Sequence, residues 1–128
     1  MKAEKRTIVG RYLIYGLLDP RDQSLRYIGK THKRRELRLK EHIEEAKEGT
    51  HRPVHRWIQE LLSEGHEPQI FIWRRISPEQ DWGDAERAAI GYWRTFSDPL
   101  PYLHPPQTPK SQPVLIRSVD LTNIRGGG

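Results

Sequence analysis

The sequence contains no cysteine, and this absence excludes several kinds of protein. Without thiols the chain cannot form disulfides, use a cysteine nucleophile or build a cysteine zinc site. No apolar run approaches the roughly 20 residues that a membrane-spanning helix needs. The basic N-terminal segment is not followed by an apolar stretch, so no secretory signal is evident. We therefore expect a cytoplasmic protein that is not secreted and does not contact membranes.

The chain has 128 residues, which fit one domain. Positive charge is concentrated in its first third. Residues 1–42 hold 12 of the 22 lysines and arginines but only 5 of the 17 acidic residues. A localised basic patch is the electrostatic footprint expected of a protein that binds phosphate backbones. Charge alone leaves open the alternative of a basic surface that is merely solvated.

The strongest local pattern is a β-hairpin near the N-terminus. Residues 11–17 and 25–30 are rich in β-forming side chains, and the turn-forming cluster Asp19-Pro20-Arg21-Asp22 lies between them. In the register that we expect, Tyr15 falls opposite Tyr27, and cross-strand neighbours project from the same face of a sheet. The hairpin therefore predicts two phenols side by side.

The residues after the hairpin predict three helices and one further strand. A basic turn leads into a helix that ends near Lys47, and Pro53 and Gly65 suit the two ends of the next helix. An apolar stretch predicts a strand at residues 69–76, and the last helix, which begins near Ser77 or near Trp82, runs to about residue 96.

The proline-rich residues 97–113 are incompatible with a helix or a central strand. We expect a catalytic domain at residues 1–96, followed by an extension or linker at 97–128.

Two of the helices carry polar side chains that invite a functional explanation. Arg38 and His42 are one helical turn apart and lie about 100° from the apolar stripe of their helix, at the border between core and solvent. The apolar stripe of the last helix, extended back one turn, reaches Glu86, and an inward carboxylate is costly unless it is paired or binds a cation. Either an ion pair with an arginine such as Arg38 or a metal ion could satisfy Glu86.

Two further features concern possible ligands. Cations crowd the start of the helix after the hairpin, where the helix dipole disfavours them, which indicates that an anion binds there. His51 and His55 are four residues apart and could bind a metal, although no third ligand lies nearby in the sequence.

Together these motifs resemble the GIY-YIG nuclease domain, which occurs in homing endonucleases, some restriction enzymes and a bacterial excision-repair subunit. The elements that carry the resemblance are Leu13-Ile14-Tyr15, Tyr27-Ile28-Gly29, Arg38 with His42, Glu86 and, after the proline-rich stretch, Leu121-Thr122-Asn123. Leu13 replaces the first glycine of the motif, and Asn123 lies further from Glu86 than is usual.

The resemblance implies an α+β fold, a small three-stranded antiparallel sheet flanked by helices, and an endonuclease that hydrolyses phosphodiesters in DNA, with RNA not excluded. It also implies catalytic roles for six residues, which are Tyr15, Tyr27, Lys30, Arg38, His42 and Glu86. One divalent cation, Mg²⁺ or Mn²⁺, would bind Glu86. Contacts with nucleic acid would come from Lys33, Arg34, Arg35, Lys40 and Asn123.

The chemistry of these groups suits phosphodiester hydrolysis. An arginine fork matches phosphate oxygens, and one carboxylate suffices for Mg²⁺, which keeps most of its waters. Tyr15 could accept a proton from water only if nearby cations favour its phenolate, since a free phenol has a pKa of about 10. Tyr27 would orient the water, and His42 would share the proton. The alternatives are an inactive nucleic-acid-binding module of the same fold and a protein-interaction domain that uses the proline-rich arm.

Overall fold

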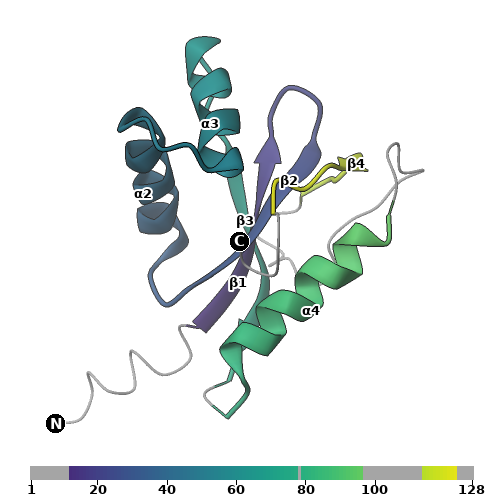
Figure 1. Ribbon diagram of the computed structural model, residues 1–128. Helices are drawn as coiled ribbons and strands as arrows, with labels where there is room; N and C mark the ends of the chain where they lie inside the picture. The colour runs from purple at the N-terminus through teal and green to yellow at the C-terminus, as the bar shows by residue number, and fades with distance from the viewer. Residues whose placement is uncertain (1–11, 78, 97–113, 124–128) are drawn as a thin grey trace, which may run out of the picture.

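The computed structural model describes residues 12–77, 79–96 and 114–123, which form an α+β fold. Helices α2 and α3 cover one face of a mixed sheet, and α4 covers the other (Figure 1). The strands are β1 (Tyr12–Asp19), β2 (Ser24–Thr31), β3 (Gln69–Ile76) and β4 (Ser118–Val119), and the helices are α2 (Arg35–Lys47), α3 (Pro53–Ser63) and α4 (Trp82–Arg94). None of these helices is long and apolar enough to cross a membrane.

Within the described residues the sheet has four strands, one of them parallel to its neighbour. The predicted α+β class is therefore correct, whereas the predicted three-stranded antiparallel sheet is wrong in strand number and direction. The strand order is β3-β1-β2-β4, and β1 pairs antiparallel with both β2 and β3. The additional strand, β4, runs parallel to β2 and pairs only at Ser24 and Leu25. Two paired residues are too few to produce an alternation that sequence analysis could detect.

The register of the hairpin differs from the predicted one by two residues. Tyr15 lies opposite Gly29, and Leu17 lies opposite Tyr27. The strands continue further towards the turn than predicted, and the turn closes tightly because Gln23 adopts a positive φ of 62°. A shift of two residues preserves the face to which each side chain points, so both tyrosines still project towards α2 and α3.

Each face of the sheet buries its own apolar cluster. The cluster beneath α2 and α3 includes the two tyrosines, and its aliphatic and aromatic members are Leu13, Leu17, Ile43, Ala46, Val54, Trp57, Ile58, Leu61 and Ile72. The cluster beneath α4 is formed by Ile14, Leu18, Leu25, Ile28, Phe71, Trp73, Ile76, Ala89, Ile90, Trp93, Ile116 and Val119. Each large side chain buried in this way contributes about 1.5–3 kcal/mol.

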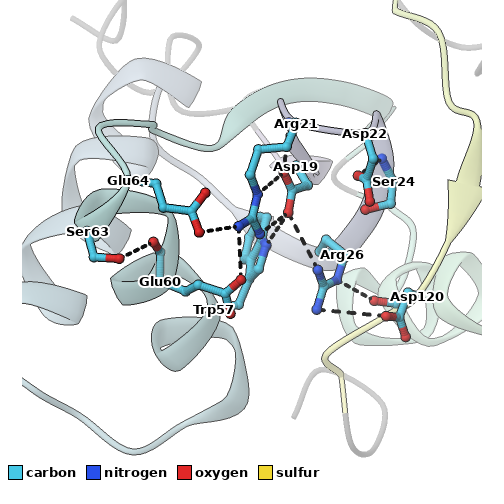
Figure 2. A network of polar contacts seen from close by, with 10 residues as sticks. All are labelled: Asp19, Arg21, Asp22, Ser24, Arg26, Trp57, Glu60, Ser63, Glu64 and Asp120. Carbon is cyan, nitrogen blue, oxygen red and sulfur yellow. Dashed lines mark hydrogen bonds and ion pairs between the residues drawn. The ribbon is translucent and has the colours of Figure 1, made fainter.

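A buried carboxylate ties the turn end of the hairpin to α3. Asp19 is 1% exposed and accepts hydrogen bonds from Arg21 Nε, at 2.9 Å, and Trp57 Nε1, at 3.0 Å (Figure 2). The Arg21 backbone amide adds a third bond at 2.8 Å. Burial raises the pKa of Asp19, but these hydrogen bonds outweigh it and lower the pKa to about 2. The carboxylate is therefore charged and structural.

Residues 114–123 pack beside β2 and α4. The amide nitrogen of Asp120 bonds to the carbonyl oxygen of Leu25, and the amide nitrogen of Thr122 bonds to that of Arg26. Most of the predicted extension, including residues 97–113, lies outside the described residues, so the domain boundary at residue 96 stays a prediction.

Candidate functional site

A glycine on β2 allows the two motif tyrosines to meet. Tyr15 and Tyr27 are 0% and 4% exposed, and their ring centroids are 6.2 Å apart. A Cβ atom on Gly29 would lie 2.6 Å from the Tyr15 hydroxyl and 2.7 Å from the ring of Tyr27. Any larger residue at position 29 would therefore push the phenols out of place.

The Tyr15 hydroxyl is held between two residues of α2. Arg38 Nε donates to it at 3.2 Å, and the hydroxyl lies 2.6 Å from His42 Nε2, to which it can donate its own proton. Burial and Tyr27 raise the pKa of Tyr15 strongly, whereas Arg38 lowers it and does not compensate. Arg38 alone therefore does not hold a phenolate here, and burial favours the protonated phenol.

His42 is fully buried, so its predicted place at the border between core and solvent is wrong. Its ring lies 5.3 Å from that of Tyr27 and 5.8 Å from that of His55, between centroids. The packing of α3 against α2 covers it, which helix periodicity alone could not reveal. Burial, with the charge of Arg38, lowers the pKa of His42 to about 3, so the imidazole is neutral.

Glu86 faces inward from α4, as its helical phase predicts, and is 4% exposed. Its ion-pair partner is Lys30, whose Nζ lies 3.3 Å from Oε1; among the described residues, no pair with Arg38 forms. The charge of Glu86 also raises the pKa of Tyr15 and Tyr27, so the carboxylate acts on both phenols.

The surroundings of Glu86 fit a divalent cation. A carboxylate is a ligand that Mg²⁺ and Mn²⁺ prefer, and Mg²⁺ commonly binds through one or two carboxylates with water in the other positions. Lys30 is its one described ion-pair partner and is 39% exposed, so this cation can move aside for another. The donor chemistry therefore agrees with the predicted ligand.

The basic residues gather where α2 begins. Within the described residues, the side chain of the N-cap residue Arg34 makes no capping bond. The backbone amide of Glu36, in the first turn, bonds to the carboxylate of its own side chain, and this bond lowers the pKa of Glu36. Lys33 is paired with Glu41, and Arg35 lies 3.3 Å from Glu36. Arg34 and Lys40 are exposed, and neither forms an ion pair within the described part of the chain.

Asn123 occupies a position that does not suit the predicted contact with nucleic acid. It is 5% exposed, and its side-chain oxygen and nitrogen bond to the backbone amide and carbonyl of Ile28, both at 2.9 Å. These bonds fix β2 between Tyr27 and Gly29. Asn123 therefore supports the strand that carries the second tyrosine.

The structure also forms a group that sequence analysis missed. His42, Glu45 and His55 each offer a potential metal-ligand atom, and the three atoms lie within 4.8 Å of one another. The predicted partner of His55, His51, is exposed and does not belong to this group. The one available signal was the spacing of His42 and Glu45, which places them on neighbouring turns of α2.

One comparison with known proteins confirms the family resemblance. The family model for the GIY-YIG catalytic domain matches residues 11–94. Neither the curated proteins nor the solved structures include a match. The matched region contains both tyrosines, Arg38, His42 and Glu86, and it ends before residues 97–128.

Proposed function

Because the chain belongs to the GIY-YIG family, we propose that this protein is an endonuclease that hydrolyses phosphodiester bonds in DNA with the help of a divalent cation. The family match indicates nuclease activity in general. The DNA substrate, the cation (Mg²⁺ or Mn²⁺) and the individual catalytic roles are our proposal. Members of this family include homing endonucleases, restriction enzymes and a DNA-repair subunit, and their action on DNA motivates the choice of substrate.

The observation that carries the proposal is the hydrogen-bonded group around the Tyr15 hydroxyl. This hydroxyl accepts from Arg38 at 3.2 Å and lies 2.6 Å from His42 Nε2, while Glu86 acts on the same phenol from α4. A structural core has no need of a guanidinium and an imidazole bonded to one phenol oxygen. Phosphodiester hydrolysis needs a phosphate ligand, a proton acceptor and a metal ligand together.

Arg38 is suited to bind the phosphate. Its side chain is 19% exposed, and in the resting state NH1 lies 2.9 Å from Glu41 Oε1. The two non-bridging oxygens of a phosphodiester can accept from the same guanidinium fork as a carboxylate, so the guanidinium can exchange Glu41 for the substrate. That movement would also uncover the hydroxyl of Tyr15.

Tyr15 and His42 are suited to transfer a proton together. Because the phenol is protonated and His42 is neutral, Tyr15 can donate its proton to Nε2 as its oxygen accepts one from water. Tyr27 lies close enough to orient that water, and Lys30 places a positive charge beside Glu86. A cation on Glu86 would relieve the charge on the phosphate and the leaving oxygen.

The start of α2 is suited to the DNA backbone. The side chains of Lys33, Arg34, Arg35 and Lys40 there together attract phosphates. Arg34 and Lys40 are exposed, so they can reach a backbone without breaking an ion pair of the described chain.

The test is a plasmid-nicking assay with Glu86→Gln. We expect Mg²⁺-dependent nicking by the wild-type protein and a loss of about 10³-fold or more in the variant, with DNA binding retained. Asp84→Asn is the matched control, because Asp84 is an exposed acid on the same helix. Nicking by Glu86→Gln at the wild-type rate would contradict the metal role, and DNA binding without nicking by the wild type would favour the inactive module.

A further inference from the structure

Two buried imidazoles on α2 and α3 each have a ring nitrogen that makes no hydrogen bond with the described residues. His42 Nε2 is bonded to the Tyr15 hydroxyl, and His55 Nδ1 is bonded to Thr50 Oγ1. The opposite nitrogens, His42 Nδ1 and His55 Nε2, are buried and have no hydrogen bond within the described part of the protein. An unsatisfied buried polar atom costs about 1–3 kcal/mol, so two of them in one place require an explanation.

A carboxylate lies beside one of these nitrogens. Glu45 Oε1 is 3.1 Å from His55 Nε2, although their alignment does not make a hydrogen bond. Ligand atoms of Glu45, His42 and His55 lie within 4.8 Å of one another. We propose that these three residues bind a divalent transition-metal ion of the Zn²⁺ type, at a site separate from Glu86.

The donor set selects the class of ion. Two imidazoles and one carboxylate are the protein ligands of a well-known kind of zinc site that leaves one position open. Imidazole nitrogen suits Zn²⁺, Ni²⁺ and Cu²⁺, whereas Mg²⁺ prefers oxygen ligands. The two proposed sites in this protein therefore differ in chemistry, and each can be tested with its own ion.

The nitrogens that would face away from the ion, His42 Nε2 and His55 Nδ1, are each bonded to a side chain, as is usual in metal-bound histidines. A histidine that binds a metal through one nitrogen normally has the other nitrogen bonded to a fixed group, which sets the orientation of the ring. Thr50 supplies that group for His55, and Tyr15 supplies it for His42. Burial lowers the pKa of both imidazoles, which favours the neutral form whose lone pair can bind the ion.

Binding would require a small contraction. Tetrahedral zinc ligands lie about 3.4 Å apart, less than the 4.8 Å limit seen here, and Glu45 is the member that can move because it is 41% exposed. Arg38 opposes a cation, since its NH1 lies 4.0 Å from Glu45 Oε2. It has a closer carboxylate partner in Glu41, at 2.9 Å, so it can release Glu45.

An ion at this site would act on the catalytic tyrosine, a consequence that rests on the proposed function. With a metal on Nδ1, the ring proton of His42 must lie on Nε2. That nitrogen would then donate to the Tyr15 hydroxyl instead of accepting from it. Occupancy of the site would therefore block the proton transfer from Tyr15 to His42 and couple nuclease activity to the supply of transition metal.

The experiment is a Co²⁺ titration of the full, untagged chain, followed by the visible absorption of tetrahedral Co²⁺. The wild type should bind one equivalent, which Zn²⁺ displaces, and Glu86→Gln should bind equally well. Glu45→Gln should weaken binding, and His55→Ala should abolish it. His51→Ala is the matched control and should bind as the wild type does, because His51 is exposed and outside the group.

A variant that keeps all three ligands can show whether a loss of binding comes from the site or from misfolding. Thr50→Val removes only the bond to His55 Nδ1, and loss of such an outer partner lowers metal affinity by about 10–100-fold. Absence of the Co²⁺ band in the wild type, or an unchanged band in His55→Ala, would overturn the proposal. Since the readout is not nuclease activity, a failed nicking assay leaves this result intact, and the reverse also holds.

Discussion

Asp19 and Tyr15 are both buried polar residues of β1, yet their surroundings differ. Around Asp19, donors from Arg21 and Trp57 satisfy the carboxylate (Figure 2). Near Tyr15, the second nitrogens of His42 and His55 make no hydrogen bond with the described residues. Buried polar groups are almost always paired, so the Asp19 carboxylate serves stability, whereas the surroundings of Tyr15 keep bonding capacity for a ligand.

The largest effect that would sharpen this contrast is expected from Tyr15→Phe. Removal of the hydroxyl takes away the group between Arg38 and His42, and loss of a positioned proton donor and acceptor lowers the rate by about 10²–10⁴-fold. The free energy of unfolding should fall by only about 1–2 kcal/mol. Nicking rates and urea unfolding measure the two quantities.

Tyr12→Phe is the control for that variant, because Tyr12 lies on the same strand and its ring packs against Trp82. We expect it to cleave at the wild-type rate. Equal activity of Tyr15→Phe and Tyr12→Phe would show that the phenol of Tyr15 takes no part in the reaction.

The reverse pattern is expected from Asp19→Ala. This change leaves Trp57 Nε1 without its partner and removes the link from Arg21 to the core, which should lower the free energy of unfolding by about 3 kcal/mol. Activity per folded molecule should be unchanged. The neighbouring Asp22→Ala removes one bond to the backbone of Ser24 and should cost about 1 kcal/mol. A similar destabilisation in both variants would contradict the stabilising role of the buried Asp19 carboxylate.

As the pH falls, the free energy of unfolding should decrease through His42 before it decreases through Asp19. Burial lowers the pKa of His42 from 6.5 to about 3, so between these values the unfolded chain binds a proton that the folded chain does not. This group therefore reduces the free energy of unfolding by about 1.4 kcal/mol per pH unit as the pH falls below about 6.5. The pKa of Asp19 is lowered from 3.8 to about 2, so its contribution disappears only at lower pH.

Urea unfolding at about pH 7 and pH 5 checks this order. The wild type should lose more stability over this interval than His42→Gln, which cannot take up the proton. His55, whose pKa burial also lowers, contributes in the same direction in both proteins. An equal decrease in the two proteins would mean that His42 is not buried in its neutral form.

The smallest effect concerns the exposed cations at the start of α2. Replacing Arg34 and Lys40 with alanine should weaken DNA binding and reduce the slope of log K against log salt by about 0.9 for each phosphate that the protein no longer neutralises. Arg56→Ala is the control, because Arg56 is an exposed cation of α3. An unchanged slope in the double variant would place the DNA elsewhere.

The sequence by itself determined the local elements and the direction of several side chains. Periodicity, Pro53 and the glycine that ends α3 predicted the helix that the structure shows, and β3 has the predicted bounds. The inward position of Glu86 followed from the phase of its helix. These features depend on residues within one element, which is why a single chain is enough to read them.

Only the tertiary structure decided how these elements meet. It set Tyr15 opposite Gly29, buried His42 and paired Glu86 with Lys30. It also brought His55 to His42, a residue of another helix. Helical periodicity predicts which face of a helix a residue occupies, but it does not predict which element packs against that face. The contacts between elements, on which the proposed chemistry depends, therefore arise from packing and not from any pattern along the chain.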